Sequence, residues 1–134
     1  MDLNRSPYAM ASAAAEEIRA LNHRTLDDHH AYPYPASINE TNSALKTLAQ
    51  RLPQTIGQLR EALDRQAQAG HIRLVVAQGQ NAPDIDTRME AVRNQLFEAE
   101  AAALALEKAL EEVGNLTCDM GYGGPVDDED EDGS

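Results

Sequence analysis

The residues best suited to hold a metal ion are His23, Asp27 and His30, with His29 adjacent. On a continuous helix the first three would share one face, and imidazole nitrogens with a carboxylate form a common ligand set for zinc. However, Asp-Asp-His-His is a poor helix sequence, and a Tyr-Pro repeat follows it at once. We therefore interpret the segment as a solvated helix end that runs into a linker, and we predict neither a metal nor another cofactor.

Paired carboxylates could in principle perform acid–base chemistry, and Glu16-Glu17 and Glu111-Glu112 are such pairs. Acid–base catalysis needs a carboxyl group perturbed by burial or by a neighbouring charge, whereas these pairs are expected on charged helix surfaces. The single cysteine, Cys118, has no basic neighbour in the sequence that would lower its pKa. The chain also lacks a glycine-rich phosphate loop and a nucleophile elbow. These residues predict a protein that is not an enzyme.

The net charge of −12 is concentrated in the second half of the chain. Residues 1–70 carry eight acidic and seven basic side chains, whereas residues 71–134 carry fifteen and four. Direct nucleic-acid binding is not expected, because no segment has the clustered Lys and Arg that phosphate contacts require. We interpret residues 115–134 as an acidic tail, disordered from Gly121 onward. Six acids form one run there: Asp127, Asp128, Glu129, Asp130, Glu131 and Asp132.

The composition is typical of one small domain with an aliphatic core, since the chain has 134 residues, no Trp and one Phe. One cysteine excludes an internal disulfide and suits a reducing compartment. No apolar run is long enough for a secretory signal or a membrane span, so we expect a cytoplasmic protein without membrane contact. Arginine outnumbers lysine nine to two, which hints at a GC-rich bacterial genome.

The elements that must position these side chains are helices. Ser6 and Pro7 suit the start of a helix that runs to about Leu26 and carries a thin apolar stripe. The Tyr-Pro repeat after it indicates a linker, because each proline favours an extended conformation in the preceding residue. Residues 1–36 are therefore predicted to form an accessory N-terminal helix and a Tyr/Pro linker.

Two longer helical segments follow. The first spans residues 38–69, opens on a capping box formed by Ser37 and Glu40, and is interrupted or kinked at Pro53. It ends on Ala69-Gly70, a suitable C-cap pair. Its seam positions at heptad spacing are Ile38, Thr41, Leu45, Leu48 and Leu52, and they resume after Pro53 at Ile56, Leu59 and Leu63. The second runs from Pro83 and Asp84 to a closing Gly114. Its seam positions are apolar at alternating steps of four and three, which is the repeat of a coiled coil. They are Ile85, Met89, Val92, Leu96, Ala99, Ala103, Leu106, Leu110 and Val113.

The nearly equal lengths of these segments predict an all-α, coiled-coil-like antiparallel hairpin over residues 37–114. If its turn is centred near residue 76 or 77, residue i lies opposite roughly residue 153 minus i. Pro53 and Gly57 then lie opposite the stretch Leu96–Glu100, near the smallest side chains of the second arm. We expect these small residues to let the two backbones approach closely.

The function that this pattern favours is protein interaction, as in a small assembly or regulatory protein. Phe97 and Leu104 lie beside the seam and widen the apolar face, so we expect the N-terminal helix or a second copy to cover them. The hairpin tip carries Ile72, Leu74, Val75 and Val76. This cluster is either a buried turn that caps the hairpin or, if exposed, a binding site for a protein partner.

Two other functions stay open. The acidic second half could mimic nucleic acid and inhibit a DNA-binding or nuclease protein, in a complex that salt would weaken. A two-helix hairpin of about a hundred residues also resembles small substrates of type VII secretion. The Trp-x-Gly turn of that family is absent, and its Tyr-x-x-x-Asp/Glu signal is not matched, because Val126 lies four residues after Tyr122. This resemblance is the lesser alternative.

Overall fold

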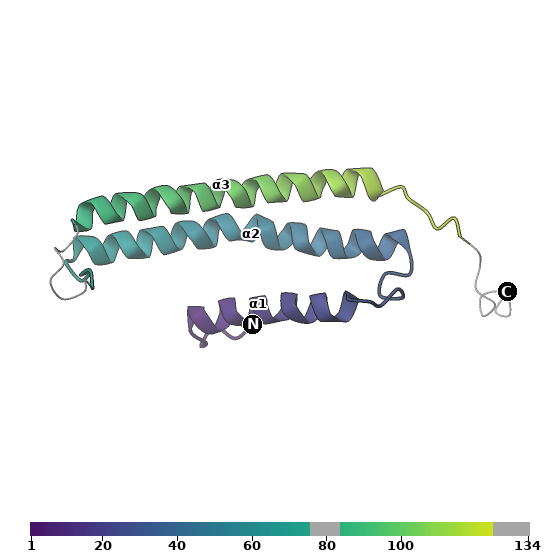
Figure 1. The fold of residues 1–134 in the computed structure, drawn as a ribbon, viewed down its shortest axis with the longest axis horizontal. Coiled ribbons are helices and arrows are strands. Elements are labelled where there is room, and N and C mark those ends of the chain that lie inside the picture. The colour runs from purple at the N-terminus through teal and green to yellow at the C-terminus, as the bar shows by residue number, and fades with distance from the viewer. Residues whose placement is uncertain (76–83, 125–134) are drawn as a thin grey trace. The chain divides into compact units, whose positions relative to one another are not determined.

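In the computed structural model of the chain, residues 1–75 and 84–124 are described, and they form three helices joined by irregular segments. The helices are α1 (Pro7–Thr25), α2 (Pro35–Gln68) and α3 (Ile85–Thr117) (Figure 1). No strand occurs in these two ranges, so the all-α prediction is confirmed. The chain divides into two units. One holds Met1–Ile38 with the residues from Met120 onward, and the other holds Asn39–Asp119.

Helix α1 begins where the sequence predicts. The Ser6 side chain caps it by accepting from the backbone N–H of Ala9 at 3.1 Å, and Pro7 occupies the first helical position. The helix ends at Thr25, one residue before the predicted end. Asp27 then adopts a left-handed conformation with φ of 58°, which turns the chain out of the helical path.

Helix α2 is one continuous helix of 34 residues, with Pro53 inside it. The helix does not break at this proline, and the loss of one backbone donor is tolerated in a helix that packs along its length. Its start corrects the prediction of a capping box, because the helix opens at Pro35 and Ser37 lies in its first turn. Pro35 has the backbone dihedral that the first helical position requires, so the helix begins three residues early.

The end of α2 matches the predicted Ala69-Gly70 cap. Gly70 has a φ of 75°, the left-handed conformation that a side chain disfavours. The N–H of His71 donates to the Gln66 carbonyl at 2.9 Å, and the N–H of Gly70 donates to that of Ala67 at 3.1 Å. These two bonds form a Schellman motif, which satisfies carbonyl groups left over at the helix end.

Helix α3 starts at the predicted cap but ends later than predicted. Asp84 accepts from the backbone N–H of Asp86 and from the Thr87 hydroxyl, at 3.0 and 3.1 Å. Gly114 does not close the helix, which continues to Thr117. Instead, Gly114 lies where α3 passes α2, and a Cβ built on it would be 3.7 Å from Asn42 Nδ2. The glycine therefore lies at a helix contact, and not at a turn.

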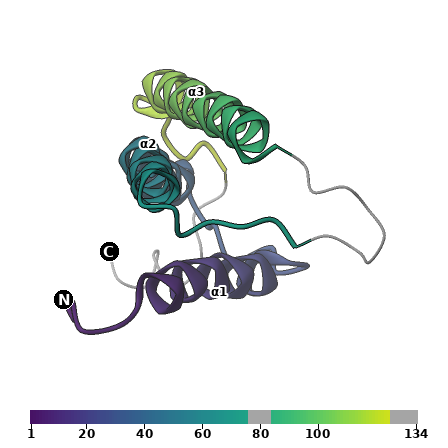
Figure 2. The same cartoon turned by 90° about the vertical axis from the view of Figure 1, so that its left-hand side faces the viewer.

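The α2 and α3 helices lie side by side and antiparallel, as both views show (Figures 1 and 2). Their register agrees with the prediction. Contacts join Asn42 to Leu110 and Arg60 to Glu100, and Gly57 faces Glu100. The packing of α2 against α3 confirms the predicted antiparallel helical hairpin, and both helices extend slightly beyond their predicted outer ends.

The hairpin buries fewer apolar side chains than its heptad pattern predicts. Among the described residues, the buried apolar side chains are Ala49, Met89 and Ala103, and Asn42 is the buried polar one. Two residues of the predicted seam, Leu106 and Val113, remain 47% and 39% exposed. The two helices thus touch along a narrow line, and much of their apolar surface is left outside it. Within the described residues, no helix has the length and apolar character needed to cross a membrane.

Candidate interaction surface

One side of the hairpin is held by charged side chains. Arg60 Nη1 on α2 lies 2.7 Å from Glu100 Oε1 on α3, with both side chains about four-fifths buried. The Arg60 guanidinium also lies over the Phe97 ring, 4.0 Å from its centroid. Nearer the tip, Arg93 Nε donates to Asp64 Oδ1 at 2.7 Å. We name this side, defined by these five residues and Leu104, the polar flank.

The absence of a side chain at Gly57 makes room for the central ion pair. A Cβ built on Gly57 would lie 2.9 Å from Glu100 Oε1, closer than such atoms approach in proteins. The sequence predicted that small residues at this level would bring the two backbones together. The structure differs: the space beside Gly57 is filled by the Glu100 carboxylate, which Arg60 holds in place.

Neutral hydrogen bonds join the helices at the other end of the hairpin. The buried Asn42 side chain donates through Nδ2 to the Leu110 carbonyl at 2.9 Å. The Thr117 hydroxyl donates to Asn39 Oδ1 at 2.9 Å. These contacts place Asn42, Ala49 and Arg60 on the line of α2 that faces α3.

The leucine stripe of α2 lies beside this line. At about 100° per residue, its leucines are centred about 90° from Asn42, Ala49 and Arg60. They are displaced away from Asp64, and therefore away from the polar flank. Leu48 and Leu59 are 37% and 57% exposed, although the heptad pattern predicted them in the seam. The stripe has steps of four and three and no charged residue: Thr41, Leu45, Leu48, Leu52, Thr55, Leu59, Ala62 and Gln66.

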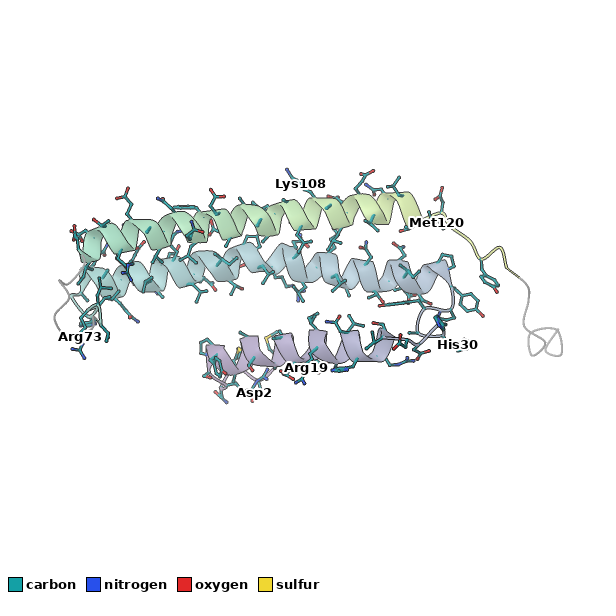
Figure 3. All side chains as sticks on the ribbon, in the orientation of Figure 1. Asp2, Arg19, His30, Arg73, Lys108 and Met120 are labelled. Atoms are coloured by element: carbon teal, nitrogen blue, oxygen red, sulfur yellow. The ribbon has the colours of Figure 1, made fainter. Side chains whose placement is uncertain are left out.

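A matching uncharged stripe runs along the C-terminal part of α3, from Ala99 to Leu116. It is rotated by about 90° from the buried Met89 and Ala103, in the direction opposite to Arg93, Phe97 and Glu100. Its members are Ala99, Ala102, Leu106, Ala109, Val113 and Leu116, again at steps of three and four. Because both stripes lie opposite the polar flank, they share one side of the hairpin, which we name the apolar flank. Lys108, in contrast, points away from α2 (Figure 3).

The residues predicted from sequence as an interface fall in three places. Phe97 and Leu104 lie on the polar flank, 54% and 48% exposed, with one face of the Phe97 ring covered by Arg60. At the tip, Ile72 and Leu74 are half-buried, whereas Val75 is 89% exposed. Val76 and the acidic run, residues 127–132, lie outside the described residues. The described members of this set, Phe97, Leu104, Ile72, Leu74 and Val75, therefore do not gather into one surface. The sequence signal for the apolar flank is the heptad spacing of its two stripes.

The possible metal ligands near the end of α1 do not share a helix face. The helix ends at Thr25, so His23 lies within it, whereas Asp27 and His30 follow its end. Asp28 instead organises this segment. It accepts from the backbone N–H of His30 at 2.9 Å and pairs with Arg24, and these two contacts lower the pKa of Asp28, the first most strongly. Across residues 1–75 and 84–124, no three His, Cys, Asp or Glu residues are placed to hold a metal ion.

The other groups considered for chemistry lie at the surface. The pairs Glu16-Glu17 and Glu111-Glu112 are exposed, and Cys118 is a free, exposed thiol. One contact has no signal in the sequence: the rings of Tyr34 and Tyr122 meet edge to face, with centroids 5.2 Å apart. Residues so distant along the chain carry no shared pattern that would predict this pair.

Comparison of the chain with protein-family models, with curated protein sequences and with solved structures finds no match.

Proposed function

We propose that this protein is a non-enzymatic helical interaction module that acts in the cytoplasm by packing its hairpin against helices of a protein partner. The observation that carries this proposal is the apolar flank. Two uncharged heptad stripes lie beside each other on a hairpin whose own contact line buries few apolar side chains. Burial of such stripes by another helix is the standard way to remove them from water.

The size of the exposed apolar surface supports packing as the driving force. Leu48, Leu59, Leu106, Val113 and Leu116 each keep more than a third of their surface exposed. Full burial of an aliphatic side chain of this kind contributes about 1.5–3 kcal/mol. The cytoplasmic assignment is supported by Cys118, because a lone exposed thiol suits a reducing compartment.

A second candidate is an acidic inhibitor that occupies a basic groove, and one observation favours it: the net charge of −12. Its most acidic part, residues 127–132, lies outside the described residues. Helix α3 itself carries seven acidic and three basic side chains, so its surface is also acidic. The two functions differ in what holds the complex together, and salt separates them.

The test is co-purification of the tagged full chain with partners, washed in half-molar salt. We expect a stoichiometric protein, identified by mass spectrometry, that stays bound at high salt and is lost with Leu106→Glu. The matched control is Leu104→Glu, which lies two residues away on the polar flank and is equally exposed.

Two results would contradict the proposal. One is the absence of any stoichiometric partner, a second copy of the chain included. The other is a complex that dissociates in half-molar salt and needs residues 127–132 but tolerates Leu106→Glu, which would favour the acidic inhibitor.

A further inference from the structure

We infer that the apolar flank is covered by the apolar flank of a second copy of this chain, so that two hairpins form a four-helix bundle. This inference rests on the proposed function and names its partner. Three observations lead to it: the extent of the flank, the charges of its two helices, and the levels at which the stripes meet.

The flank is large enough for a stable dimer. The α2 stripe from Thr41 to Gln66 is about 38 Å long at 1.5 Å per residue. The α3 stripe from Ala99 to Leu116 is shorter, about 26 Å. At about 10 Å of width for each helix, the two stripes together amount to about 630 Å² on each protomer. The total of about 1,260 Å² lies at the lower end of the range of about 1,200–2,000 Å² for specific interfaces.

The charges of the two helices decide how the copies are oriented. Helix α2 carries four basic and three acidic side chains, whereas α3 carries three basic and seven acidic ones. A two-fold axis parallel to the helices places α2 of one copy against α3 of the other. A two-fold axis perpendicular to them places the acidic α3 against its own copy, where like charges repel. We therefore assign the parallel axis.

The stripes meet at matching levels in this arrangement. A rotation about an axis parallel to the helices leaves every residue at its level along the bundle. Leu48 of one copy therefore lies at the level of Leu106 and Ala109 of the other, as it does within its own hairpin. All neighbouring helices are antiparallel, and each of the four pairs aligns steps of three and four, as in antiparallel bundles.

The first experiment measures the mass of the full chain by sedimentation equilibrium over a range of concentrations. We expect a dimer at tens of micromolar that persists in half-molar salt. Leu106→Glu should raise the dissociation constant at least about a hundredfold, because it buries two unpaired charges in the interface. Leu104→Glu should leave the constant unchanged, since both leucines are about half exposed but lie on opposite flanks.

Leu59→Glu gives a second test from α2, because Leu59 is 57% exposed and its replacement does not disturb the line between the helices. Circular dichroism confirms that each variant keeps its helices. A wild-type chain that stays monomeric at these concentrations overturns the inference. So does a dimer that Leu104→Glu weakens more than Leu106→Glu, because its interface would then be the polar flank.

Disulfide formation tests the orientation. Leu48→Cys and Ala109→Cys are made in separate chains, each with Cys118→Ser, and the two are mixed under mild oxidation. We expect a disulfide between the two variants, because their helices adjoin only with the parallel axis. A dimer that yields no mixed disulfide overturns the assigned geometry. A monomeric wild type that still binds another protein through Leu106 overturns the inference and leaves the proposed function standing.

Discussion

Arg60 on α2 makes two contacts with α3, one to a carboxylate and one to an aromatic ring. Its planar guanidinium offers one face to the Phe97 ring and an N–H to Glu100, so a single side chain spans both helices. Partial burial strengthens the ion pair relative to an exposed one. Gly57 completes the arrangement, because the carboxylate occupies the space that a Cβ would need.

The coupling between Gly57 and Glu100 gives a prediction whose sign depends on background. In the Glu100→Ala background, Gly57→Ala should raise the free energy of unfolding by about 1 kcal/mol, since alanine favours the helix. In the wild-type chain the same change should raise the free energy of unfolding by less than this, or lower it, because the new Cβ displaces the Glu100 carboxylate from Arg60. A double-mutant cycle by urea denaturation measures the difference. Equal effects in both backgrounds would show that Glu100 moves aside without cost.

Asp28 allows a prediction about pH. The His30 N–H and Arg24 hold the pKa of this carboxyl below its ordinary value of 3.8. Because the folded pKa is depressed, the contacts stabilise the folded segment above pH 3.8, and this contribution is lost as the pH falls through the folded pKa. NMR titration of the Asp28 carboxyl should show a midpoint below 3.8.

A variant separates the two causes of the Asp28 shift. Arg24→Ala should raise the midpoint only in part, because the backbone N–H of His30 still donates to the carboxylate. Full return to the ordinary value would show that Arg24 alone depresses the pKa. An unchanged midpoint would show that Arg24 contributes nothing.

At the scale of the helices, two glycines at which the sequence predicts a helix end have different roles. Gly70 ends α2 in a left-handed conformation, whereas Gly114 lies inside α3 beside Asn42. The difference matters because a side chain is strained only where φ is positive, and helix interiors favour alanine.

These two positions predict opposite effects of one substitution. Gly70→Ala should lower the free energy of unfolding by about 1 kcal/mol, because the left-handed conformation is disfavoured by a Cβ. Gly114→Ala should raise it by up to about 1 kcal/mol, because the added methyl group makes an ordinary contact and favours the helix. Thermal or urea unfolding of the pair checks both. A destabilising Gly114→Ala would mean that α2 and α3 approach more tightly here than the 3.7 Å contact indicates.

Along the sequence of the whole molecule, the apolar stripes and the longest acidic run occupy separate segments. The apolar flank belongs to the hairpin, whereas a large share of the negative charge lies in residues 127–132. Deletion of these six residues halves the net charge of −12 and leaves every described residue in place. The proposed dimer should therefore survive the deletion with its dissociation constant within a few-fold of wild type.

Sedimentation of the deleted chain beside the full chain measures this effect. The matched comparison is the same pair in half-molar salt, where any repulsion between the two acidic ends is screened. Loss of the dimer on deletion would contradict the proposed mode of association and give the acidic residues a direct role.

Much of the fold could be predicted because it is local. Local signals include the caps at Ser6 and Asp84 and the Schellman motif at Gly70, each of which depends on residues within a few positions of one another. The same local signals set the length of each helix, and the two lengths can then be compared. The candidate surface was harder to predict. The spacing predicts that Phe97 and Leu104 lie outside the seam, as observed, but it also predicts that the leucines of α2 contact α3, whereas Leu48 and Leu59 remain exposed.

The amino-acid sequence alone determined three helices, their approximate bounds and the antiparallel hairpin, because periodicity and capping act over a few residues. Only the tertiary structure decided how each helix is rotated about its axis. Two overlapping heptad stripes satisfy the same periodicity, so spacing cannot choose between them. The choice comes from contacts between distant residues, Arg60 with Glu100 and Asn42 with Leu110, which turn small and polar positions inward and leave the leucine stripe on the apolar flank.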